Sequence, residues 1–181
     1  MILKSFLLEK NLPLIDNYNL ILFYGENIGL KDEFKSNLKK KYNNFEQLVF
    51  NQEEILKNEK LLDDQVNNIS MFNDNKIIFI SEVSDKIASR IDNIIEEPRN
   101  HVKLILFSQN LEKKSKIRSV LEKSKKCGVI PCYQDNHRTL TEYTKEKLKS
   151  YSGINQEIIN LLINNSGLDR KVLFNEIEKI K

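Results

Sequence analysis

Five short runs rich in apolar residues, separated by segments of helical periodicity, constrain the fold of this chain more than any other feature. The runs lie at Leu20–Tyr24, Phe45–Phe50, Ile77–Ile80, Val102–Phe107 and Gly128–Tyr133. Apolar runs of this length are typical of strands that are covered on both faces of a parallel sheet. Strands that alternate with helices predict a doubly wound α/β sheet. Pro131 places the last strand at an edge of that sheet, because proline cannot donate a ladder hydrogen bond.

Between these runs, apolar side chains recur at the spacing of one helical face. The clearest stripe consists of Leu30, Phe34, Leu38 and Tyr42. Further helices are indicated by apolar residues within Leu61–Ile69, within Ile87–Ile95 and across 113–126. A short lead-in helix, interrupted at Pro13, precedes the first strand.

The pattern changes after Tyr133, where only helical segments follow. Residues 134–138 form a polar linker, and Thr139–Glu142 has the pattern of a capping box at a helix start. A second helix follows the N-cap residue Asn155, and a third runs from Leu168. The sequence therefore predicts an α/β domain over residues 1–137 and a small all-α domain over residues 138–181.

Length and composition limit the class of protein. The chain has 181 residues, of which 40% are hydrophobic and 30% charged, enough for one core and a small satellite. No apolar run approaches the roughly 20 residues that cross a bilayer, and the start lacks a signal peptide. We therefore expect a cytoplasmic protein with no membrane partner. Cys127 and Cys132 are the only cysteines, too few for a zinc site, so we expect no metal and no cofactor.

The charge of the chain gives weak support for nucleic-acid binding. The net charge is +3, and of the 29 basic residues 24 are Lys and 5 are Arg. Proteins that depend on bidentate phosphate or guanine contacts favour Arg. One basic helix is nevertheless a candidate for facing DNA, and its leading residues are Lys113, Lys114, Lys116 and Arg118. The alternative is a solvated helix face.

The turn after the first strand has the position of a phosphate-binding loop but not its residues. A working loop places Gly-Lys-Ser/Thr after four variable residues, so that the Lys reaches the terminal phosphate and the hydroxyl holds magnesium. Here Leu30 replaces the second Gly and Asp32 replaces the hydroxyl. Gly25, Glu26, Gly29 and Lys31 therefore form a degenerate nucleotide loop that we expect to be non-functional, and we assign no catalytic residue.

The segment before the third strand carries a bulky apolar pair within polar residues. Met71 and Phe72 follow Ser70 and precede the polar turn Asn73–Asn75. One interpretation is that the pair packs beneath the end of the preceding helix, because apolar side chains usually lie inside. The other is an exposed anchor that fills a pocket on a partner protein. The residues alone leave both open.

The order of these motifs resembles that of the delta subunit of bacterial DNA polymerase III, the clamp-opening subunit of the clamp loader. The match covers nearly the whole chain. The segments that carry it are Leu22–Glu26, Ser70–Ile80, Leu104–Ser108, Leu111–Lys116, Gly167–Arg170 and Asn175–Ile180.

The resemblance implies an AAA+-like fold of the P-loop NTPase type without ATPase activity, followed by a small helical lid. It implies that Met71 and Phe72, with Ser70, bind a hydrophobic pocket of the sliding clamp (the beta subunit), and that the chain acts within the bacterial replisome. Other partners would be the gamma/tau and delta prime subunits and primed DNA. Family members continue into a C-terminal collar domain that binds those subunits, and we expect this chain to lack it.

Two alternative functions remain beside the non-catalytic clamp-loader subunit. The first is an active loader ATPase, against which the missing Gly-Lys-Ser/Thr argues. Ser81–Asp85 at the end of the third strand also lacks a clean Asp-Glu pair for magnesium and water activation. The second is a direct DNA-binding protein, for which binding would weaken steeply with salt.

Overall fold

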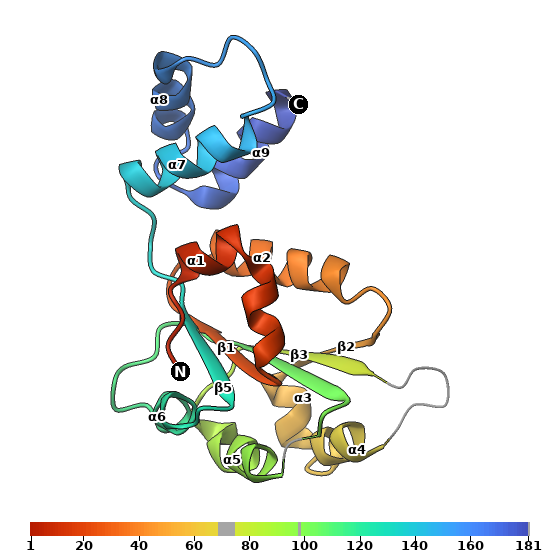
Figure 1. Cartoon of the computed structure of the whole chain (residues 1–181). Coiled ribbons are helices and arrows are strands. Elements are labelled where there is room, and N and C mark those ends of the chain that lie inside the picture. Colours follow the sequence, from red (N-terminus) through yellow and green to blue (C-terminus); the bar gives the residue numbers. More distant parts are fainter. Residues whose placement is uncertain (69–74, 98, 181) are drawn as a thin grey trace.

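A parallel sheet of five strands forms the centre of the computed structural model, which describes residues 1–68, 75–97 and 99–180 (Figure 1). The strands are β1 (Leu20–Tyr24), β2 (Glu46–Asn51), β3 (Lys76–Ser81), β4 (Val102–Phe107) and β5 (Cys127–Pro131). Their order is β2-β3-β4-β1-β5, and every neighbouring pair is parallel. The predicted parallel α/β sheet is confirmed, and β5 lies at an edge as Pro131 indicated.

The register of the central strands brings distant loops together. Leu20 of β1 pairs with Leu104 of β4 on one side and with Cys127 of β5 on the other. Because parallel strands all end at the same edge of a sheet, the loops that follow them meet there. Gly25 after β1 and Ser108 after β4 are therefore neighbours, although they are 83 positions apart in the sequence.

One face of the sheet is covered by the N-terminal helices and by α2. These elements are α1 (Ser5–Lys10), the 3-10 helix η1 (Leu12–Asn17) and α2 (Ile28–Lys41). Alternate strand residues point to this face, where Phe23 packs against Phe34 and Phe107 with ring centroids 5.0 and 5.2 Å apart. The apolar stripe that predicted α2 is the stripe that the sheet buries: Leu30, Phe34 and Leu38 are all buried.

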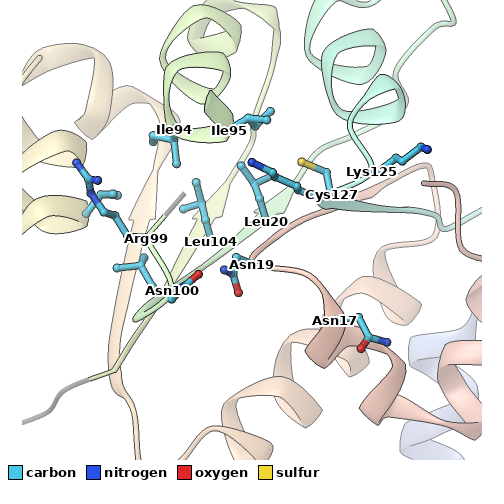
Figure 2. A pocket seen from close by; sticks show the side chains of 13 residues that line it. Asn17, Asn19, Leu20, Ile94, Ile95, Arg99, Asn100, Leu104, Lys125 and Cys127 are labelled. Carbon is cyan, nitrogen blue, oxygen red and sulfur yellow. The ribbon is translucent and has the colours of Figure 1, made fainter. Parts of the chain in front are cut away.

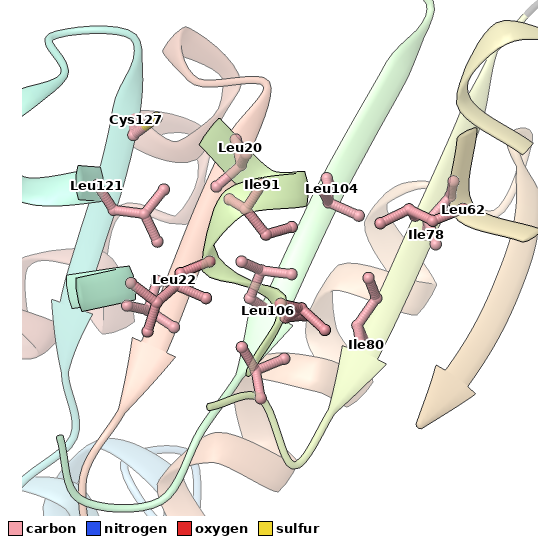
Figure 3. Packing of buried hydrophobic residues seen from close by; sticks show 14 of the residues in the cluster. Leu20, Leu22, Leu62, Ile78, Ile80, Ile91, Leu104, Leu106, Leu121 and Cys127 are labelled. Carbon is pink, nitrogen blue, oxygen red and sulfur yellow. The ribbon is translucent and has the colours of Figure 1, made fainter. Parts of the chain in front are cut away.

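The opposite face packs against a second layer of helices (Figures 1 and 3). These are α3 (Gln52–Lys57), α4 (Leu61–Asn67), the 3-10 helix η2 (Asp85–Ile87), α5 (Ala88–Glu96) and α6 (Lys116–Lys123). Leu22 and Leu106 of the sheet share one apolar cluster with Ile91 of α5 and Leu121 of α6. The two buried faces explain why the central strand β1 is apolar along its whole length.

Three further helices form a separate apolar cluster. They are α7 (His137–Lys147), α8 (Gln156–Asn165) and α9 (Arg170–Ile180). Their shared core comprises Leu140, Tyr143, Leu148, Ile159, Ile163, Leu173 and Ile177. Figure 1 shows them stacked beyond α1 and α2, on the same side of the sheet. We refer to α7–α9 as the helical lid.

Two predicted helix starts in the lid are corrected. The capping box is not Thr139–Glu142, because α7 begins earlier: the Asn136 Oδ1 atom accepts from the Thr139 amide, and Thr139 Oγ1 accepts from the Asn136 amide, both at 3.0 Å. A short Asn side chain caps as well as Thr does. The third helix begins at Arg170 rather than Leu168, because Leu168 has a left-handed φ of 65°. Asn155 is an N-cap as predicted.

Candidate functional site

The loop between β1 and α2 is tied to its neighbouring strands by its main chain. Gly25 has a φ of 128°, and a Cβ atom at this position would lie 2.3 Å from the carbonyl oxygen of Cys132. The amide of Gly25 donates to the carbonyl oxygen of Gln109 at 3.1 Å, and the amide of Asn27 donates to that of Cys132 at 3.0 Å. Only glycine fits this approach of two backbones.

The first turn of α2 is capped by the chain's own side chains. Asn27 Oδ1 accepts from the amide of Leu30 at 2.9 Å. Asn27 Nδ2 donates to the carboxylate of Asp135 at 2.7 Å and to the carbonyl oxygen of Tyr133 at 3.1 Å. The amides at such a helix start are the groups that hold phosphate in a nucleotide loop. Here one of those amides is already satisfied internally.

Lys31 occupies the place of the phosphate-binding lysine, but its ammonium group points into the protein. Lys31 Nζ donates to the carbonyl oxygen of Gly25 at 2.7 Å and to that of Ser108 at 2.8 Å. The side chain is buried, and this burial lowers the pKa of Lys31. Its charge therefore joins the β1–α2 loop to the end of β4. Glu26 in the same loop is exposed and accepts from Asn110 Nδ2 at 3.1 Å.

Helix α9 of the lid closes over the start of α2. A Cβ atom on Gly29 would lie 3.0 Å from the amide nitrogen of Lys171 and 3.1 Å from Arg170 Cβ. Lys171 Nζ also donates to the carboxylate of Asp32 at 3.1 Å. The volume above the α2 N-terminus is thus taken by the first turn of α9, and glycine at 29 permits that approach.

Arg170 is buried at the centre of this contact and binds carboxylates from three separate parts of the chain. Its guanidinium lies 3.3 Å from Glu33 of α2 and 3.2 Å from Asp135 of the linker, and it also contacts Glu9 of α1. The guanidinium carbon stacks 4.2 Å from the ring centroid of Tyr143. We call Arg170, Glu9, Glu33 and Asp135 the Arg170 cluster.

The Arg170 cluster carries more negative than positive charge. Lys147 adds a second cation, with Nζ 2.5 Å from Glu33. Burial opposes the charge of Arg170, but the carboxylates of Glu9, Asp135 and Glu33 outweigh it and raise the pKa of Arg170. Burial raises the pKa of Glu9, since it outweighs the attraction to Arg170. A buried arginine with several carboxylates holds the lid against α1 and α2 in a fixed geometry.

The carboxylates after β3 do not face this loop as a catalytic pair. Glu82 is exposed and has a left-handed φ of 59°. Asp85 Oδ1 instead accepts from Ser115 Oγ at 2.6 Å and from the amide of Ile117 at 3.0 Å. These hydrogen bonds at the start of α6 lower the pKa of Asp85, the bond from Ser115 most strongly.

The candidate DNA-facing residues divide into two groups. Lys113, Lys114 and Lys116 are exposed at the start of α6. Arg118 is turned inward: Nε lies 2.8 Å from the Glu122 carboxylate, and one terminal nitrogen donates to the carbonyl oxygen of Leu111 at 2.9 Å. Its guanidinium also stacks on the ring of Tyr24 at 4.7 Å. Arg118 therefore contributes to packing, and only the lysines project into solvent.

The predicted clamp-binding residues Ser70, Met71 and Phe72 lie outside the described residues. The structure describes the chain on either side of them. Helix α4 ends at Asn67, and Leu62 and Val66 on this helix are buried. On the other side, the carbonyl oxygen of Asn75 accepts from the amide of Glu46 at 3.0 Å and precedes β3.

No metal centre and no membrane span occur in the part of the chain that the structure describes. No group of three or more His, Cys, Asp and Glu side chains there is arranged to hold a metal ion. None of the helices in these ranges is both long and apolar enough to cross a bilayer. Cys127 and Cys132 are both buried and unpaired, and burial raises the pKa of Cys132 to about 12.

Sequence reasoning missed the Arg170 cluster altogether. Arg170 and Glu9 are 161 residues apart, and Asp135 lies in a segment that reads only as a polar linker. The one available signal was the rarity of arginine, with 5 Arg among 29 basic residues. Arg is preferred over Lys where several carboxylates must be bound in a fixed geometry.

Comparison with known proteins identifies the family. Residues 21–132, more than half of the chain, match the family described as "DNA polymerase III, delta subunit". A search of curated proteins gives no match.

Three solved structures are similar in fold. The Bacillus subtilis DNA clamp loader delta protein has a TM-score of 0.71 at 18% identity, over 97% of this chain and 56% of that one. Domain III of the Thermotoga maritima replication initiation protein DnaA has a TM-score of 0.51 at 15% identity, over 97% and 79%. A Thermotoga maritima RuvB variant has a TM-score of 0.59 at 12% identity, over 96% and 59%.

These likenesses confirm the AAA+-like fold with a helical C-terminal region that the resemblance implied. The chain spans little more than half the length of the clamp loader delta protein it resembles. With the family match over residues 21–132, it follows that this chain belongs to the DNA polymerase III delta subunit family.

Proposed function

We propose that this chain is the clamp-binding part of a clamp-loader subunit. It binds the sliding clamp, the beta ring, and opens it for loading onto primed DNA during replication. Membership of the delta subunit family carries this proposal. Binding the open ring more tightly than the closed ring is sufficient to open it, because a ligand shifts an equilibrium by its differential affinity. If the native protein has a collar domain, that domain would make the contacts with the gamma/tau and delta prime subunits.

The proposed role is not catalytic. Hydrolysis of a nucleoside triphosphate needs a lysine that reaches the terminal phosphate and a hydroxyl that holds magnesium. Here the ammonium of Lys31 is bound by two main-chain carbonyl oxygens, and the carboxylate of Asp32 pairs with Lys171. Arg170 also holds the lid over the start of α2 by contacts within the chain. In this proposal the chain is a subunit of a DNA polymerase (nucleotidyltransferase) holoenzyme and catalyses no reaction of its own.

The proposed anchor for the clamp is the pair Met71 and Phe72, assisted by Ser70. The support is the sequence pattern, in which two large apolar residues stand among polar ones just before β3. Helix α4 already buries Leu62 and Val66, so the residues beyond its end are not needed for that apolar face. Met and Phe are among the residues that are enriched in the buried cores of protein interfaces.

The test is one double variant measured in two ways. M71A/F72A is expected to weaken binding to the cognate clamp ring by about 2–4 kcal/mol, the range for a central aromatic anchor. Its free energy of unfolding should change little. The matched control is L161A/V172A, which removes two exposed apolar side chains from the lid and should leave clamp binding unchanged.

Either of two results would contradict the anchor. A pair buried in the core would instead cost about 3–5 kcal/mol of stability per large residue, so a collapse of the melting temperature argues for packing. Unchanged clamp binding by a well-folded M71A/F72A variant would remove the proposed contact. If the unmodified chain does not bind the ring at all, the proposed function itself fails.

A further inference from the structure

A pocket opens at the amino-terminal end of the sheet, at the opposite end of β1 from the β1–α2 loop (Figure 2). Its volume is about 350 Å³. Its apolar lining consists of Leu20, Val66, Ile94, Ile95, Val102, Leu104 and Cys127. Most of these residues begin a strand or end a helix, so the pocket is an unfilled end of the apolar layer between the sheet and α4–α6.

The rim of this pocket is polar and positively charged. It is formed by Asn17, Asn19, Arg99, Asn100, Lys125 and Lys126, and none of the described residues that line the pocket carries a carboxylate. Lys125 and Lys126 are exposed and form no ion pair with any described residue. The N-terminal ammonium of Met1 is held beside the same wall, where it donates to the carbonyl oxygen of Cys127 at 2.7 Å.

The positive charge is concentrated on the side of α6 and β5. Arg99, on the other side, is partly neutralised, because its guanidinium lies 3.3 Å from the Glu97 carboxylate. A neighbouring hollow that shares Val66, Ile94 and Arg99 with the pocket also carries acidic residues, Asp63, Glu96 and Glu97. An acidic partner would therefore approach Lys125 and Lys126 rather than Arg99.

The pocket adjoins the proposed clamp-binding segment at its described end. Val66 in the last turn of α4 lines the pocket. Asn67, the final residue of that helix, accepts a hydrogen bond from Arg99 Nε at 3.2 Å through its side-chain oxygen. A protein that binds beside the described end of α4 would thus lie next to the pocket.

We propose that this pocket is a second contact for the sliding clamp. It accepts an apolar side chain of the clamp, while carboxylates beside that side chain pair with Lys125 and Lys126. The inference rests on the proposed function and names a site that the Met71–Phe72 anchor does not include. The volume is at the lower end of the roughly 300–1,000 Å³ of small-molecule sites, which suits one or two side chains. The apolar lining favours a protein over a phosphate backbone, which would use only the lysines.

Charge reversal at the rim tests the electrostatic half of the contact. K125E/K126E is expected to weaken binding to the cognate clamp ring by about tenfold, mainly through slower association. The loss should shrink as salt is raised, because salt screens exposed charges. The matched control is K40E/K145E, which makes the same charge change at exposed positions of α2 and α7 that do not line the pocket and should leave clamp binding unchanged.

A substitution that fills the pocket tests the apolar part of the proposed clamp contact. Ile95 is half-buried at the pocket wall, so I95W is expected to occupy the volume without disturbing the core. We expect weaker clamp binding with the salt dependence unchanged. Thermal melting of each variant checks that it is folded. If I95W does not fold, the two double Lys→Glu variants still test the contact, because they alter only exposed side chains.

The outcomes separate this inference from the proposed function. Equal clamp binding by K125E/K126E and K40E/K145E overturns the pocket contact. The proposed function is tested separately, by the binding of the unmodified chain and of M71A/F72A to the clamp ring. If K125E/K126E weakens binding to primed DNA and leaves clamp binding intact, the rim is a DNA contact and the proposal is equally wrong.

Discussion

The ammonium group of Lys31 donates a hydrogen bond to the carbonyl oxygen of Gly25 across 2.7 Å and thereby closes the β1–α2 loop on itself. In a working phosphate loop the same lysine reaches outward to the nucleotide. The second hydrogen bond, to Ser108 at 2.8 Å, ties the loop to β4. In this chain the lysine at that position is part of the fold.

The first prediction is that the chain does not bind ATP at micromolar concentration. The amide of Leu30 is capped by Asn27 Oδ1, and the lysine is occupied. Calorimetric titration with magnesium-ATP should give only the heat of dilution. Saturable heat would contradict the structural role of the loop.

The second prediction concerns the stability that Lys31 provides. K31M should lower the free energy of unfolding by about 1–3 kcal/mol, because two buried carbonyl oxygens lose their donor. K40M, on the exposed face of the same helix, is the control and should change stability little. The measurement is denaturant unfolding of both variants. Equal stabilities would show that solvent replaces the ammonium.

The third prediction concerns Arg170. R170M should destabilise the chain by about 3–5 kcal/mol, because it leaves the carboxylate of Asp135, whose side chain is 6% exposed, and the partly buried carboxylates of Glu9 and Glu33 without their buried cation. The control is R138M, since Arg138 is exposed and among the described residues pairs only with Glu142, at i,i+4. Hydrogen exchange should show loss of protection first in α9 and in the start of α2. Uniform loss across the sheet would argue against a local contact of the lid.

The fourth prediction is a pH dependence set by Glu9. Burial raises the pKa of Glu9 above its ordinary 4.5, so the folded state binds this proton more tightly than the unfolded state. The resulting stability is fully present below pH 4.5 and is lost as the pH rises through the raised pKa. E9Q mimics the neutral acid, and Arg170 retains Glu33 and Asp135.

E9Q should therefore flatten the fall in stability with rising pH and be at least as stable as the parent chain at neutral pH. Denaturant unfolding at a series of pH values measures this. A variant that loses more stability at neutral pH than at pH 4.5 would show that the ionised Glu9–Arg170 pair is net favourable.

The fifth prediction has the opposite sign and concerns Asp85. Its pKa is lowered below 3.8, chiefly by the hydrogen bond from Ser115, so its contribution is present above pH 3.8 and lost as the pH falls through the lowered value. At neutral pH, D85N should cost about 0.3–1 kcal/mol, the range for an exposed charge at a helix start. The two chains should converge in stability in acid. A constant difference at every pH would assign the effect to the neutral hydrogen bonds alone.

The sequence alone determined the layered α/β architecture, because each strand and helix follows from a local pattern. Leu20–Tyr24 is apolar at every position because both faces of β1 are covered, and Leu30, Phe34 and Leu38 share one helical face. The sequence also shows the departure from a phosphate-loop pattern, at Leu30 and Asp32. The resemblance to the delta subunit family rests on such ordered segments.

Only the tertiary structure decided what the polar residues do. Arg118 reads as part of a basic helix, yet it packs on Tyr24. The sequence places Lys31 in a non-functional nucleotide loop, whereas in the structure its ammonium group holds two loops together. Arg170 meets Glu9 from the far end of the chain. Apolar patterning is periodic and can be read locally, whereas the partner of a buried charge is chosen by which distant segments the fold brings within a few ångströms.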